Sequence, residues 1–437
     1  MVVLIKGNKI KAVNKKIRIS KEAIVTDGTG KYLVPGLWDM HTHALRAERI
    51  EAFFPLFIAN GITGIRDMAM PLENLELLKQ WRKEIETGNR IGPRIFASGA
   101  TLGGARPQLT IRVANEVEAR QAVVTLKQHG ADFIKVHSLL HRALFFAAAD
   151  EARKQGLDVV GHVPVGVSAA EASDAGMKSM EHLYGILECC SSNEEEVRKE
   201  VEQAAINPDT WAAWGAVVRT TDKLYGQQEN KKTFSKEKTK SLFDRFVKNG
   251  TWQCPTLVMR RALALREDSS FKKDIRLNYI PRSDVNSWSP QTDTRNVNLS
   301  AQEITNRNIR LAKESELVGE MSRAGIKILA GTDLGNPYVY PGFSLHDELE
   351  LLVQAGLSTM QALQTATINP ARFFGREKEL GTIEKGKIAD LVLLDTNPLE
   401  NISNTKKIAA VIINGRLLRR TDLDALLKKG ADIAKKQ

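Results

Sequence analysis

The chain has 437 residues, of which 42% are hydrophobic and 26% charged, as is typical of a globular protein with a sizeable core. At this length we expect one large domain and a smaller one. The sequence contains no run of about 18 apolar residues, which excludes a membrane-spanning helix. The apolar start, Met1–Lys6, is too short for a secretory signal, so the chain as given is expected to be cytoplasmic, with no membrane partner.

The net charge of +11 would suit a nucleic-acid partner, so its position along the chain matters. Residues 1–19 carry six basic groups and no acid, and residues 405–437 carry nine basic groups and three acids. The body between these ends is therefore close to neutral, which favours solvated termini over a polyanion-binding surface. We expect a small-molecule substrate and no nucleic acid as partner; a homo-oligomer stays open.

The three cysteines exclude two classes of small protein. Cys189 and Cys190 are adjacent and Cys254 is isolated, so no CxxC spacing occurs. This pattern fits neither a disulfide framework nor a cysteine zinc knot. Free thiols agree with a reducing compartment.

The predicted elements begin with two short strands, Val2–Lys6 and Lys9–Val13, joined by a two-residue turn. Further along, short apolar runs alternate with helical patterns such as Glu116–His129, which indicates βα units around a parallel sheet. Eight strands are expected, at Leu37–His43, Gly61–Met68, Arg94–Ala100, Ala131–Ser138, Val159–Val163, Ser179–Gly185, Thr251–Val258 and Lys327–Asp333. The repeats have the number and size of an α/β (β/α)8 TIM barrel.

Strands return near the C-terminus, at Ala389–Leu394 and Ala409–Ile413. Both ends of the chain are thus rich in strands. The simplest arrangement is a small composite β-sandwich domain built from residues 1–34 and 375–437, with a helix at the very end. The barrel then spans residues 35–374.

Two strand–helix connections are too long for ordinary loops. Residues 186–250 and 259–325 contain helical patterns and are predicted to be helical insertions. Insertions after barrel strands lie on the catalytic face, so they are candidates for a lid or a substrate pocket. Decoration without a function is equally consistent with their patterns.

The chemistry is first indicated by His41 and His43. Residues two apart on a strand face the same side, here the inside of the barrel. A catalytic divalent metal needs several imidazoles or carboxylates that converge and leave a position for water. Because the chain has eight histidines, an HxH pair can arise by chance, so the pair gains weight only from further candidates.

Four further candidates lie in or at the end of other predicted strands. Lys135 lies in an apolar strand, where burial lowers the pKa of an amine. A neutral amine can capture CO2 as a carbamate, an anionic ligand able to bridge two metals. His162 and His182 end successive strands; one such histidine is usually a core residue, but two after an HxH strand favour metal binding. Asp333 ends the eighth strand, where a turn-forming role is the alternative.

These residues resemble the metal-ligand series of the amidohydrolase superfamily. The resemblance rests on Pro35–His43, Lys135, His162, His182, Gly331–Asp333, Asn369–Arg372 and Gly381–Val392, and covers nearly the whole chain. It is strongest to the imidazolonepropionase-like group, especially prolidase-like members with a carboxylated lysine. Imidazolonepropionase itself has one metal and lacks the bridging lysine, so Lys135 argues against that identity. Members of the group begin with one more strand, often after an export signal, so a periplasmic location also stays open.

The resemblance implies a binuclear centre with two divalent ions, preferably Zn2+. Its ligands would be His41, His43 and Asp333 for one ion, His162 and His182 for the other, and Lys135, as N6-carboxylysine, between both. A bridging hydroxide would attack a carbonyl carbon, and Asp333 would carry its proton to the leaving nitrogen.

The resemblance also implies the reaction, hydrolysis of an amide in a small molecule such as a dipeptide or an N-acyl amino acid. A lactone, a carbamate or urea, or a phosphotriester is the alternative with the same site. A non-enzymatic relative that keeps the barrel as a scaffold is the alternative from another class. Such proteins typically lose ligands, whereas all six are present here.

Five further side chains are predicted to contact the substrate. His137 and Tyr184 follow Lys135 and His182 by two residues, so they are expected to face the site and take part in catalysis or substrate binding. Arg66 ends the second strand and is expected to bind a substrate carboxylate or to orient a ligand. The loop after the eighth strand is expected to wall the pocket with its two tyrosines, Tyr338 and Tyr340. A structural role is equally consistent with each of these side chains.

Overall fold

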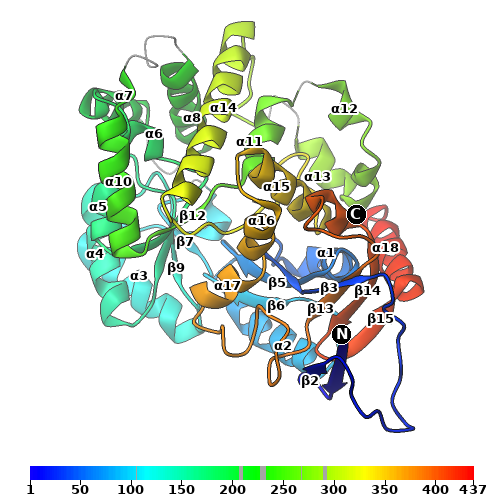
Figure 1. Cartoon of the computed structure of the whole chain (residues 1–437). Coiled ribbons are helices and arrows are strands. Elements are labelled where there is room, and N and C mark those ends of the chain that lie inside the picture. Colours follow the sequence, from blue (N-terminus) through cyan, green and yellow to red (C-terminus); the bar gives the residue numbers. More distant parts are fainter. Residues whose placement is uncertain (105, 206–209, 227–232, 267, 289–292) are drawn as a thin grey trace.

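The computed structural model describes residues 1–104, 106–205, 210–226, 233–266, 268–288 and 293–437. A ring of parallel strands forms its centre, with helices around the outside and over one end (Figure 1). Within the described ranges, no helix is both long enough and apolar enough to cross a membrane.

Seven regular strands and one extended segment make up the ring. In order they are β4 (Leu37–Thr42), β5 (Ile62–Asp67), β6 (Arg94–Ala97), β9 (Ile134–Val136), β10 (Val159–Gly161), β11 (Met177–Glu181), β12 (Trp252–Cys254) and residues 327–334. The extended segment joins both neighbours, because the Gln253 amide donates to Lys327 (3.0 Å) and the Met40 amide to Ala330 (2.9 Å). The eight predicted strands therefore occupy the eight positions of the ring. Two short strands, β7 (Thr101–Leu102) and β8 (Thr110–Ile111), extend one edge at the rim.

The outer helices bury apolar residues, and some of them begin with a side-chain cap. They are α1 (Ala47–Ala59), α2 (Asn74–Glu86), α3 (Glu116–His129), α4 (Arg142–Lys154), α5 (Ala169–Asp174), α15 (Phe343–Gln354), α16 (Thr359–Thr365) and α17 (Ile368–Phe373). A short 3-10 turn, η1 (Pro107–Leu109), lies between β7 and β8 in the sequence. In α3, the Asn115 side chain accepts from the Glu118 amide, and Gly130 ends the helix in the left-handed region at φ 92°. These local signals explain why the predicted bounds of α3 are correct.

The two predicted insertions are helical in the described residues. The first holds α6 (Ile186–Cys189), α7 (Glu194–Ala204), α8 (Trp211–Gly226) and α10 (Lys236–Asn249); the second holds α11 (Leu257–Ala264), α12 (Ser269–Lys272), η2 (Ile275–Tyr279), α13 (Arg282–Ser287) and α14 (Ala301–Arg323). Buried ion pairs join them, since Asp222 on α8 pairs with Arg307 and Arg310 on α14, and Glu314 pairs with Arg260 on α11. Figure 1 shows α7, α8 and α14 together at one end of the barrel.

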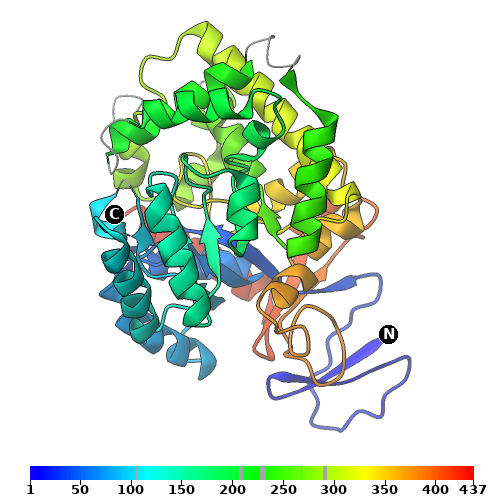
Figure 2. The same ribbon diagram turned by 90° about the vertical axis from the view of Figure 1, so that its left-hand side faces the viewer.

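Strands from both ends of the chain lie together beside the barrel (Figure 2). They are the hairpin β1 (Val2–Lys6) and β2 (Lys9–Asn14), and an antiparallel sheet of β3 (Tyr32–Pro35), β13 (Leu391–Leu394), β14 (Ile408–Ile413) and β15 (Arg416–Arg419), with η3 (Ile402–Lys406) and a final helix α18 (Arg420–Ala434). The Ile10 amide donates to Lys387 (2.8 Å) and the Ala389 amide to Asn8 (2.9 Å), which ties the hairpin to the segment before β13. The two ends thus share a small core, while the sandwich and the domain boundaries stay predictions.

Candidate metal centre

Three predicted ligands meet at the end of β4. The Asp333 Oδ1 atom lies 3.2 Å from His43 Nε2 and 3.4 Å from His41 Nε2. One ligand atom from each of these residues lies within 4.8 Å of the others, which is close enough for all three to hold one ion.

His162 and His182 lie beside this group. Their ring centroids are 4.9 Å apart, and the His182 ring is 4.4 Å from that of His41. Lys135 lines the same cavity as His43, His162, His182 and Asp333. The structure therefore brings together all six predicted ligand side chains, because the carboxyl ends of the parallel strands point to one end of the barrel.

Two of the ligand candidates have an unusual backbone conformation. His182 (φ 62°) and Asp333 (φ 58°) lie in the left-handed region, which residues other than glycine seldom occupy. Both follow directly after a ring position, so the sharp turn of the chain aims their side chains across the end of the barrel. Backbone strain of this kind is characteristic of functional sites.

Each buried histidine in the group has one ring nitrogen engaged by a neighbouring oxygen. The Nδ1 atoms of the three rings pair with Glu181 Oε2 (2.8 Å, from His41), Ser138 Oγ (3.0 Å, from His162) and Thr256 Oγ1 (2.7 Å, from His182). This arrangement fixes each ring and leaves Nε2 for a ligand, as in known metal sites. In His41 that atom is buried without a hydrogen bond, so the donor set fits a divalent ion.

Lys135 fits the carbamate that the sequence predicts. Its Nζ atom is buried and has no hydrogen-bond partner among the described residues. Burial lowers the pKa of this amine to about 8, which increases its neutral, reactive fraction. A buried polar group without a partner is costly, and conversion to an oxygen ligand would remove that cost.

The surrounding electrostatics favour neutral imidazoles. Burial, helped by the charge of Lys135, lowers the pKa of His41 to about 4 and of His137 to about 3. Burial alone would raise the pKa of Asp333, but His182, His41 and His43 outweigh it and hold that pKa well below its ordinary value. Neutral rings and an ionised carboxylate are the forms that bind metals.

Arg66 does not line the cavity, so it is not placed to bind a substrate carboxylate there; its contacts fit the other predicted role, that of orienting a ligand. Its side chain is fully buried, and one of its terminal nitrogens donates to both oxygens of Glu181 (2.9 Å each). Another nitrogen donates to Ser179 Oγ (2.8 Å) and the third to the Met40 carbonyl. Because these partners lie inside the barrel, Arg66 holds Glu181, which in turn holds His41.

The two tyrosines after the eighth strand also lie elsewhere. Tyr340 is 1% exposed under the guanidinium of Arg276, 4.5 Å from its ring centroid. Tyr338 packs against Phe271 and Trp288, with ring centroids 5.1 and 5.3 Å away. Neither tyrosine lines the cavity, because each ring packs against partners in the second insertion. The loop itself does border the cavity, through Gly335 and Asn336, so the prediction is wrong for the two tyrosines alone.

The cavity between the ligand candidates, here called the metal cavity, has a volume of about 680 Å³ that includes space open to solvent, and both predicted insertions contribute to its walls. His137 and Tyr184 line it as expected, although their catalytic roles stay a prediction. The unforeseen lining comes from a loop and from the two insertions: Arg106, Trp211, Trp214 and Arg295. The sequence could not identify these particular side chains as cavity residues, because their distance from the site depends on how the insertions fold back. Glu181 could have been found, since it is an acid beside a predicted ligand in an apolar strand.

A strand ring with histidines, a lysine and an aspartate at its carboxyl ends defines a barrel of the metal-dependent hydrolase class. The chain belongs to the amidohydrolase family, whose model matches residues 32–418. The superfamily and the hydrolase class predicted from the sequence are thereby confirmed.

Two curated relatives match part of the chain. A 5-methylthioadenosine/S-adenosylhomocysteine deaminase of Moorella thermoacetica is 32% identical over 25% of this chain and 30% of its own length. An imidazolonepropionase of Shouchella clausii is 33% identical over 23% of this chain and 25% of its own length. The chain thus spans less than a third of the length of these relatives.

Solved structures match nearly the whole chain. A Xaa-Pro dipeptidase with bound methionine is 22% identical, with a TM-score of 0.65 over 95% of this chain and 94% of that one. A putative prolidase from Bifidobacterium longum is 24% identical, with a TM-score of 0.64 over 97% and 92%. At these identities the likeness shows the fold, and it confirms the barrel.

We expect Glu181→Gln to lower the affinity for zinc about 10- to 100-fold, because the amide cannot orient His41 as a carboxylate does. Equilibrium dialysis followed by metal analysis measures this. The matched control is Glu348→Gln, a buried acid on α15 whose pKa burial raises to about 8, so that it is largely neutral at pH 7. Equal zinc affinity in the two variants would contradict the role given to Glu181.

Proposed function

We propose that the protein is a binuclear metal-dependent amidohydrolase that cleaves an amide bond in a small molecule, such as a dipeptide or an N-acyl amino acid. The observation that carries this proposal is the buried amine of Lys135, which has no hydrogen-bond partner among the described residues. It lies in a cavity bordered by His43, His162, His182 and Asp333, with His41 next to them. A single-metal site needs no such lysine, whereas a two-metal site needs a bridging anion.

The ligands would divide as the family resemblance implies, with His41, His43 and Asp333 on one ion, His162 and His182 on the other, and carboxylated Lys135 between them. Two divalent ions in such a site, most simply Zn2+, polarise a carbonyl and lower the pKa of water towards neutrality.

The protein's own side chains would handle the proton and the substrate. The Asp333 carboxylate lies within 3.7 Å of three histidines, at the centre of the group, so it is placed to accept a proton and pass it to the leaving nitrogen. Tyr184 lines the cavity beside His162 and His182 and could donate its hydroxyl proton to the carbonyl oxygen. His137 is kept neutral by burial and could hydrogen-bond the substrate.

The charge of Arg106 favours an amide of an amino acid as the substrate over a lactone, a carbamate or urea, or a phosphotriester. It lines the cavity and stacks over Trp211 at 4.9 Å, yet no described carboxylate forms an ion pair with it. Arg295, in contrast, is paired with Asp293. The Arg106 side chain is exposed, and its guanidinium stays cationic at pH 7. An unneutralised guanidinium in the cavity suits a substrate carboxylate.

The reaction is tested with zinc-loaded protein and a library of dipeptides, N-acyl amino acids, lactones, carbamates and phosphotriesters. We expect the highest kcat/KM on an amide that carries a free carboxylate. A preparation that hydrolyses lactones or esters but no amide would reject the proposal in favour of the alternative chemistry.

The bridging role predicts that Lys135→Ala holds at most one zinc equivalent and loses activity, because the shared ligand between the ions is gone. Wild type should hold two equivalents after loading with zinc and bicarbonate. Lys79→Ala, at an exposed lysine on α2, is the matched control and should behave as wild type. Two zinc equivalents and full activity in Lys135→Ala would contradict a two-metal site bridged by this residue.

The carboxylate anchor predicts that Arg106→Gln raises KM about 10- to 100-fold for an N-acyl amino acid, through the loss of a charge-assisted contact. The same substrate with its carboxylate capped as an amide should show no such change. Arg153→Gln, at an exposed arginine on α4, serves as the control in steady-state assays. An equal effect of Arg106→Gln on both substrates would rule out carboxylate recognition.

A further inference from the structure

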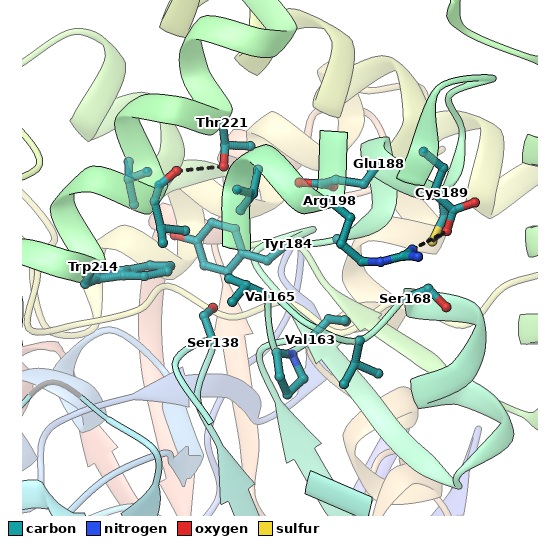
Figure 3. A pocket seen from close by; sticks show the side chains of 17 residues that line it. Ser138, Val163, Val165, Ser168, Tyr184, Glu188, Cys189, Arg198, Trp214 and Thr221 are labelled. Atoms are coloured by element: carbon teal, nitrogen blue, oxygen red, sulfur yellow. Dashed lines mark hydrogen bonds and ion pairs between the residues drawn. The ribbon is translucent and has the colours of Figure 1, made fainter. Parts of the chain in front are cut away.

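A second cavity, with a volume of about 490 Å³ that includes space open to solvent, lies beside the metal cavity (Figure 3). Its walls come from the segments after β10 and β11 and from α7 and α8 of the first insertion. The proposed chemistry does not use it. We name it the side chamber.

Two aromatic rings lie where the side chamber adjoins the metal cavity, and we call this pair the partition. Tyr184 and Trp214 are the residues that line both spaces. Their ring centroids are 5.2 Å apart, and the rings are nearly perpendicular at 84°. The ring of the ligand candidate His162 lies 5.0 Å from Tyr184 and 5.5 Å from Trp214. The side chamber therefore begins directly behind the residues that border the reacting group.

Two arginines from other elements contact the tyrosine of this partition. The guanidinium groups of Arg260 and Arg310 lie 5.7 and 5.9 Å from the centre of the Tyr184 ring. Both arginines are buried and pair with Glu314 on α14 (2.8 Å each). These contacts hold the Tyr184 ring in place at the border of the two spaces.

The side chamber offers apolar contact and few free polar groups. Six valines contribute to its walls: Val163, Val165, Val167, Val201, Val217 and Val218. The polar side chains have partners in the protein, since Ser138 bonds His162, Thr221 donates to the Val217 carbonyl, and Arg198 pairs with Glu194.

Glu188 is the acid in the chamber wall that forms no salt bridge with the described residues, although Arg310 and Arg260 attract its carboxylate. In Figure 3 it lies on the side of Tyr184 opposite Trp214, away from the partition. Burial raises the pKa of its carboxyl, which favours the uncharged form. The chamber as a whole therefore suits a hydrocarbon group rather than a charged one.

We infer that the side chamber binds an apolar acyl group of the substrate, so that the preferred substrates are amino acids N-acylated with a medium-length hydrocarbon chain. This inference rests on the proposed function. If Arg106 holds the carboxylate, the amino-acid half is anchored by charge and the acyl half is the part left to reach the partition. Each methylene buried in the chamber should strengthen productive binding about fourfold.

The test compares N-octanoyl and N-acetyl derivatives of one amino acid. Wild type should prefer the octanoyl substrate at least 100-fold in kcat/KM, mainly through KM. Val165→Phe, at a half-buried residue of the chamber wall, fills the space and should lower that preference at least tenfold. Val201→Phe, on α7, is a second filling variant should the first fold poorly. Val117→Phe, 77% exposed on α3, is the matched control and should keep both rates.

Three outcomes would overturn the inference. Wild type could show no preference for the octanoyl substrate, or both filling variants could keep that preference unchanged. The third outcome is that the filling variants change the preference among amino-acid side chains but not among acyl chains. Calorimetric titration with 1-octanol separates this inference from the proposed function. If no N-acyl amino acid is hydrolysed, the function fails, yet wild type and Val117→Phe should still bind one equivalent of octanol and Val165→Phe should not. Equal binding by all three, or by none, would reject the chamber as an apolar site.

Discussion

The site depends on a carboxylate buried between two partners inside the barrel. Glu181 is fully buried, accepts two contacts from Arg66 and holds the Nδ1 atom of His41. A charge in this position is tolerable only because the guanidinium compensates it, and removing either partner would leave the other uncompensated. The ion pair thus fixes the ring of the first ligand before any metal arrives, which reduces the cost of assembling the site.

The residues around this pair are arranged for chemistry at the expense of stability. Lys135 has no hydrogen-bond partner among the described residues, and His182 and Asp333 hold a strained backbone conformation. Each feature costs free energy in the folded protein, and the closed ring of strands and its packed outer helices offset that cost. Under the proposed function, metal ions and a carbamate on Lys135 would supply the missing interactions.

The side chains that would select the substrate come from the two insertions, whereas those that would perform the chemistry come from the strand ends. Ligand candidates come from the strand ends, whereas Trp211, Trp214 and Arg295 come from the helices that fold over them. Buried ion pairs between α8, α11 and α14 hold these helices together, so the aromatic partition keeps its place. Changes in the insertions could therefore alter specificity while the ligand group stays the same, as is usual for barrel enzymes.

The sequence alone determined the strand ring and the six ligand candidates. Strand periodicity places His41 and His43 on one face, and a polar residue that ends an apolar strand must lie at the carboxyl end of the barrel. The surroundings were decided by tertiary structure. Arg66 lies at the end of a strand, where a substrate-binding residue is expected, but it pairs with Glu181, a buried acid on a strand far along the chain. Arg106 and the side chamber could not be predicted, because they depend on contacts across the insertions that no local pattern encodes.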